Sequence, residues 1–180
     1  VHGDEKFVAV ADAYPYSNTA AYSTNGITWT QTALPAVVNW EDVTYGDGKF
    51  VAVASATAIA AYSTNGITWT QTALPSSRSA AAVTYGDGKF FAITSSTSPV
   101  SAYSTDGITW TDITLPYRTY SVITHAWGTF VATPFSGDKA AISTDGITWT
   151  ETIMHTTAGW RSLTSGIANR FDKINSFIYP

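Results

Sequence analysis

The most restrictive feature of this sequence is a unit of about 40 residues that occurs four times. The clearest copies are residues 40–75 and 80–116. The phenylalanine after a glycine-containing turn recurs at 7, 50, 90, 130 and 171, and the tryptophan of Gly-Ile-Thr-Trp recurs at 29, 69, 110 and 149. A fixed period of this length is typical of supersecondary units that stack to share a core.

Each unit predicts four short strands, which in the second copy are residues 42–45, 49–54, 60–63 and 67–72. A Gly-Asp-Gly turn at 46–48 supplies the positive φ angles of a tight hairpin. The second strand is apolar throughout, so we expect both its faces to be buried. The fourth strand alternates apolar and polar residues, which indicates one solvated face.

These patterns predict an all-β fold, a small β-propeller of about four four-stranded antiparallel blades. The chain is expected to be one domain over residues 1–180, with repeats at about 1–35, 40–75, 80–116 and 120–155, a closing strand at 160–166 and a tail at 167–180.

Closure of the ring is expected to come from both chain ends. Residue Val1 aligns with Thr44, inside the first strand of a unit, and residues 160–164 match residues 40–44. We therefore expect residues 163–165 to pair with residues 6–10. The alternative is a fragment that another chain completes.

A sequence resemblance supports the propeller. Ser-Thr-Asp-Gly-Ile-Thr-Trp at 104–110 and 143–149, with Asn for Asp at 23–29 and 63–69, resembles the Asp-box (BNR repeat) of sialidases and sortilin-like propellers, shortened by one residue. The units also look like those of bacteriophage tail-associated and bacterial surface proteins. The resemblance implies structural turns, in which Asp or Asn accepts backbone hydrogen bonds and Trp packs between blades, at Asn25, Trp29, Asn65, Trp69, Asp106, Trp110, Asp145 and Trp149.

The connections after strands two and four differ from copy to copy, whereas the two turns barely change. In an antiparallel blade the variable connections share one end, and function is often carried on loops held by a rigid frame. We expect a ligand to bind there, at Tyr14, Tyr16, Trp40, Arg78, Tyr117, Arg118 and Phe135. Trp40 also falls at the same repeat position as Tyr120 and Trp160, which favours packing for that residue.

Composition limits the partners. Only 12% of residues are charged, the net charge is −4, and the nine Lys and Arg are scattered, which argues against nucleic acid. No apolar run approaches 18 residues, so no membrane insertion is expected. Cysteine is absent, and the three histidines have no ligand spacing, so we predict no metal and no cofactor.

A sialidase would need an arginine triad and acidic partners spread over about twice this length of chain. We therefore predict that the chain is not an enzyme and that it binds a cell-surface glycan or protein receptor, as part of a phage tail or secreted surface protein, at an extracellular or virion surface. The alternative is a structural subunit of a virion appendage or extracellular filament, as a homo-oligomer or with other surface subunits. A glycosidase-like or sialidase-like enzyme is the third reading.

Overall fold

The computed structural model describes residues 1–94, 100–116, 119–158 and 163. These residues form only β-structure, in four sheets of four antiparallel strands each, so the predicted all-β fold is confirmed. In the same ranges no helix is long and apolar enough to cross a membrane.

Each sheet is one continuous stretch of chain. Sheet one contains β1 (His2–Gly3), β2 (Lys6–Val10), β3 (Ser17–Ser23) and β4 (Thr30–Val38). Sheet two contains β5 (Trp40–Gly46), β6 (Lys49–Ala54), β7 (Thr57–Ser63) and β8 (Thr70–Arg78). Sheet three contains β9 (Ala80–Gly86), β10 (Lys89–Thr94), β11 (Val100–Ser104) and β12 (Thr111–Thr114). Sheet four contains β13 (Tyr120–Ala126), β14 (Thr129–Pro134), β15 (Gly137–Ser143) and β16 (Thr150–Ala158).

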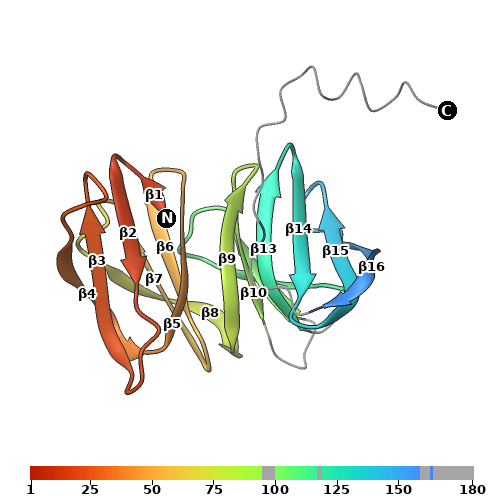
Figure 1. Ribbon diagram of the computed structural model, residues 1–180, viewed down its shortest axis with the longest axis horizontal. Coiled ribbons are helices and arrows are strands. Elements are labelled where there is room, and N and C mark those ends of the chain that lie inside the picture. Colours follow the sequence, from red (N-terminus) through yellow and green to blue (C-terminus); the bar gives the residue numbers. More distant parts are fainter. Residues whose placement is uncertain (95–99, 117–118, 159–162, 164–180) are drawn as a thin grey trace.

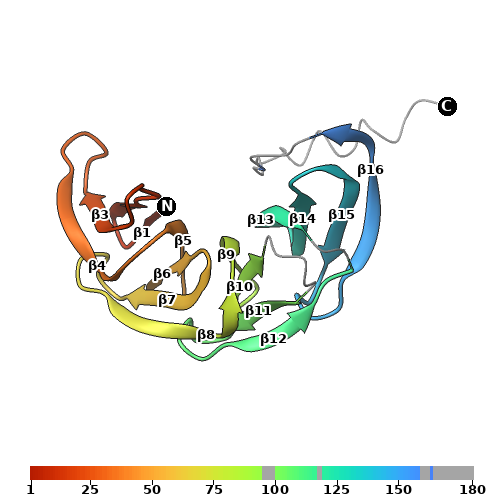
Figure 2. The ribbon, with the colours of Figure 1, turned by 90° about the horizontal axis from the view of Figure 1, so that it is seen from below.

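The four sheets follow one another as the blades of a propeller (Figure 1). Seen along the strands, they lie on an arc, with the first strand of each sheet on the inside and the fourth on the outside (Figure 2). Sheets one and four are the two ends of this arc. The predicted closing strand at residues 160–166 lies outside the described residues apart from Leu163.

The Gly-Asp-Gly hairpins form as predicted. Gly46 pairs with Lys49, and Asp47 and Gly48 have φ angles of 46° and 70°. Gly46 must be a glycine for a different reason, because the ring of Tyr85 from the next sheet lies directly where its side chain would be.

Strand four starts and ends later than predicted. We expected residues 67–72, but β8 covers Thr70–Arg78, and Ile67 belongs to the preceding turn. Only Ser79 separates β8 from β9, so the connection after strand four is a single residue here. Pairing of Thr57 with Arg78 accounts for the longer strand, because β7 also starts earlier than predicted.

We call the face of a sheet on the side of the next sheet in the chain its forward face, and the opposite face its rear face; between consecutive sheets, a forward face packs on a rear face. Sheets one and two form one core cluster. The forward face of sheet one contributes Val8, Ala20 and Leu34 to it. The rear face of sheet two contributes larger side chains and two alanines, namely Trp40, Phe50, Ala52, Ala61 and Trp69. Equivalent clusters join sheets two and three and sheets three and four. The core is therefore three copies of one interface.

Hydrogen bonds accompany this packing. Thr32 Oγ1 donates to the carbonyl of Ile67, 2.7 Å away in the next sheet, and Thr72 Oγ1 donates to Ile108 at 2.6 Å. The turn that accepts these bonds fits closely, because a Cβ built on Gly66 would lie 2.9 Å from Val8 Cγ2. Gly66 also has a φ of 70°, which favours glycine.

The four repeated tryptophans are not equivalent in burial, contrary to our expectation. Trp69 and Trp110 are each 8% exposed and Trp149 is half-buried, but Trp29 is 44% exposed. The reason is positional: each tryptophan lies on a rear face, and no sheet of the described chain precedes sheet one.

This difference yields a stability prediction. Replacing Trp69 with Ala should lower the free energy of unfolding by about 3–5 kcal/mol, since it empties a buried aromatic site. Trp29→Ala is the matched control and should cost only about 1–2 kcal/mol in dilute solution, since its ring is already partly hydrated. Urea unfolding followed by far-ultraviolet circular dichroism measures both. Equal losses would show that the two positions are packed alike.

Candidate functional site

The antiparallel pairing gives each sheet two different ends. The hairpins between strands one and two and the turns between strands three and four lie at one end, which we call the turn end. The connections after strands two and four lie at the other, which we call the loop end. The ligand-binding residues predicted from the sequence belong to the loop end.

At the turn end the repeated Asn or Asp organises its own turn. Asn65 Oδ1 accepts hydrogen bonds from the backbone nitrogens of Ile67 and Thr68, both at 2.9 Å. Ser63 Oγ accepts from Gly66 N at 2.9 Å and donates to Asn65 Oδ1 at 3.0 Å. The same bonds recur around Asn25, Asp106 and Asp145. The Oδ1 atoms of these side chains therefore bind the backbone of their own turns.

Where the turn residue is aspartate, these bonds stabilise its charged form. Hydrogen bonds from the backbone of Thr109 and Ile108, with Ser104, lower the pKa of Asp106 from 3.8 to about 2. The backbone bonds of Ile147 and Thr148 lower the pKa of Asp145 to about 2 as well.

These shifts predict acid sensitivity. A carboxylate whose pKa is lower in the folded chain than in the unfolded chain adds stability above pH 3.8, and this is lost as the pH falls towards 2. Asp106→Asn should therefore melt near the wild-type temperature at pH 7, because Asn25 and Asn65 make the same bonds, and should lose less stability than wild type between pH 4 and 2. Thermal melts over that range test this, with Asp12→Asn in the exposed β2–β3 connection as control. Parallel acid curves for wild type and Asp106→Asn would contradict it.

At the loop end, backbone hydrogen bonds join the connection after strand two to the connection that precedes strand one of the same sheet. Ser55 N donates to Asn39 O at 2.9 Å, and Phe135 N donates to Thr119 O at 3.1 Å in sheet four. Asn39 Nδ2 also donates to Glu41 Oε1 at 3.1 Å and to Ser55 Oγ at 3.2 Å. These connections are therefore held in place before any ligand arrives.

The predicted ligand-binding residues differ in their exposure to solvent. Tyr14, Tyr16 and Phe135 are 99%, 60% and 49% exposed. Trp40 is fully buried, and its Nε1 donates to Ala36 O at 3.1 Å, so it is a core residue and not a surface contact. Arg78 is the last residue of β8.

Tyr117 and Arg118 lie outside the described residues. The three exposed aromatics are not gathered into one patch within the chain. Tyr14 and Tyr16 belong to sheet one and Phe135 to sheet four, the opposite ends of the arc (Figure 2).

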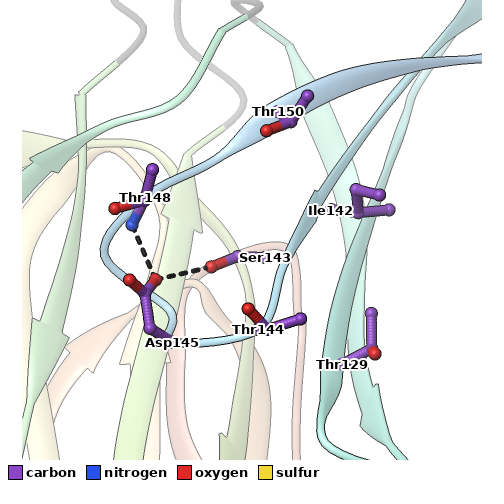
Figure 3. Close-up of a pocket in the computed structure, with 7 residues that line it drawn as sticks. All are labelled: Thr129, Ile142, Ser143, Thr144, Asp145, Thr148 and Thr150. Atoms are coloured by element: carbon purple, nitrogen blue, oxygen red, sulfur yellow. Dashed lines mark hydrogen bonds between the residues drawn. The ribbon is translucent and has the colours of Figure 1, made fainter.

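A pocket that sequence reasoning missed opens on the forward face of sheet four at the turn end (Figure 3). Its volume is about 360 Å³, and its lining is Thr129, Ile142, Ser143, Thr144, Asp145, Thr148 and Thr150. Two substitutions in the fourth repeat could have indicated this pocket. The other repeats carry lysine (6, 49, 89) at the position of Thr129 and tyrosine (22, 62, 103) at that of Ile142, so the fourth repeat has lost two large side chains.

No group of three histidine, aspartate or glutamate side chains is placed to hold a metal ion anywhere in the described ranges.

No protein-family model and no curated protein matches this chain. Several solved structures resemble it. A streptogramin B lyase superposes with a TM-score of 0.68 at 17% identity, over 78% of this chain and 49% of that one. Virginiamycin B lyase from Staphylococcus aureus gives 0.68 at 15%, over 77% and 50%. YCF48 bound to D1 peptide gives 0.58 at 18%, over 78% and 49%.

These likenesses show a β-propeller repeat fold, and the chain spans about half the length of the structures it matches. They contradict our prediction that the chain is not an enzyme, since the same blade arrangement occurs in a lyase. At 15–17% identity, however, the likeness concerns the fold alone. The resemblance to the Asp-box and to phage tail proteins stays a hypothesis.

Proposed function

We propose that this chain is a recognition module that binds a cell-surface glycan through its loop end, as part of a phage tail or secreted surface protein. The observation that carries the proposal is the exposure of Tyr14 and Tyr16, at 99% and 60%, on a connection that no turn geometry requires to be aromatic.

The chemistry of the loop end suits sugars. Aromatic faces stack on the C–H faces of sugar rings, while neighbouring polar groups bind hydroxyls. The connection that carries the two tyrosines also holds the exposed carboxylate of Asp12, and Asn18 follows it on β3. Aromatic residues that remain in water in the free protein are a usual feature of binding surfaces.

A second candidate function is that of a structural subunit in a virion appendage or extracellular filament. The faces of sheets one and four that no other described sheet covers favour it, since exposed apolar surface of this kind is typical of contacts between subunits.

Binding and stability should respond to different residues. Tyr14→Ala and Tyr16→Ala should each weaken glycan binding at least roughly tenfold, as expected for aromatic hot spots, with melting temperatures almost unchanged. Asn65→Ala at the turn end should do the reverse, because two backbone nitrogens would lose their acceptor.

A glycan array run beside thermal melts on the same variants tests this. Tyrosine variants that bind every array glycan as well as wild type would refute the proposed site. Wild-type protein that binds no glycan but still binds cells stripped of glycans would point to a protein receptor instead.

A further inference from the structure

The two ends of the arc expose the two halves of the interface that elsewhere joins consecutive sheets. On the rear face of sheet one, Phe7 is 38% exposed, whereas its equivalents in the other sheets (50, 90, 130) are fully buried. Ala9 is exposed, whereas Ala52, Ala92 and Ala132 are buried. Trp29 and Ile27 are 44% and 84% exposed. This is the same apolar surface that sheets two, three and four present to their predecessors.

The forward face of sheet four shows the complementary surface. Val131 is half-buried, whereas Val8, Val51 and Phe91 at the same position are covered. Met154 is half-buried, whereas Leu34, Leu74 and Leu115 are at most 4% exposed. Ile142 is 38% exposed.

The pocket of sheet four lies where each of sheets one, two and three contacts a turn of the sheet that follows it. In sheet one the successor's Gly66 packs against Val8, and Thr32 bonds to Ile67 O. Sheet four has Thr152 at the position of Thr32 and a pocket lined by Thr129, Ile142 and Thr150 beside it. In sheet one the equivalent turn, residues 24–28, contacts no preceding sheet among the described residues. Its Gly26 is therefore exposed, whereas Gly66, Gly107 and Gly146 at the same position are buried.

We infer that the forward face of sheet four binds the rear face of sheet one of a second copy of this chain, head to tail. The occupant follows from the interface itself, which the chain already makes three times with its own sheets. The turn at residues 24–28 of the second copy fills the pocket, and Thr152 donates to its Ile27 carbonyl.

Such an interface is heterologous, so it either closes into a ring or continues as a filament. The two ends lie apart on one arc (Figure 2), and the chain spans about half the length of the propellers it resembles, which together favour a ring of two chains. In that ring Phe135 of one copy lies on the sheet next to the one that carries Tyr14 and Tyr16 of the other, all at the loop end. This consequence for the glycan site rests on the proposed function, whereas the assembly does not.

Sedimentation velocity of the full chain between about 1 and 50 µM tests the contact. We expect wild type to sediment at twice the 19.2 kDa chain mass, or as a longer assembly. Trp29→Glu, on the rear face, and Ile142→Glu, on the forward face, should each weaken association at least roughly tenfold, because an unpaired charge would enter the interface. Ile153→Glu is the control, since that residue is 58% exposed and its equivalents Ala33, Ala73 and Thr114 are exposed in every sheet.

Mixing the two variants is the decisive step. Trp29→Glu keeps an intact forward face and Ile142→Glu keeps an intact rear face, so an equal mixture should form a one-to-one complex although neither variant associates alone. Wild type that stays monomeric throughout would overturn the inference, whether the chain closes on itself or its own C-terminal residues cover sheet four. So would a dimer that both variants leave intact, or variants whose mixture stays monomeric.

Discussion

The packing of one sheet's aromatic rear face on the next sheet's aliphatic forward face is the interaction on which this structure depends. No sheet could bury its apolar residues alone, because each has two apolar faces and only four strands. Phe50 and Trp69 become core residues only because Val8, Ala20 and Leu34 of the preceding sheet cover them. At the first two of these interfaces, Thr32 and Thr72 also donate hydrogen bonds to the next sheet's turn, which adds a directional contact to the apolar packing.

Much of the fold could be predicted because the same local turn and strand patterns occur in all four repeats. The Gly-Asp-Gly hairpins, the apolar second strand and the Asn or Asp turns are local, so residues near in sequence suffice to specify them. Strand four was misplaced because its extent depends on pairing with β7, which starts at Thr57, three residues before the predicted strand. The burial of Trp29 was misjudged because an identical local sequence has a different environment in sheet one, on whose rear face no other described sheet packs.

The functional surface was harder to predict for the same reason. Trp40 looked like a loop aromatic, but the chain passes from β4 to β5 through Asn39 alone, so Trp40 falls within a strand and into the core. Tyr14, Tyr16 and Phe135 are exposed, yet they belong to sheets at opposite ends of the arc. Repeat position alone gives the end of the sheet on which a residue lies, but the number and order of blades decide which residues become neighbours. The pocket of sheet four depends on two residues that differ from the other repeats, which only the comparison of all four sheets makes visible.

A sheet of this protein is stable only to the extent that both of its faces are covered by neighbouring sheets. Backbone hydrogen exchange, measured by mass spectrometry at several protein concentrations, tests it most directly. We expect peptides of β6, β7 and β10 to exchange slowly at every concentration, because sheets two and three have a neighbour on each side. Peptides of β2 and β15, in the end sheets, should exchange faster in dilute protein and slow down as the concentration rises. Equal protection of all four sheets at every concentration would contradict the account.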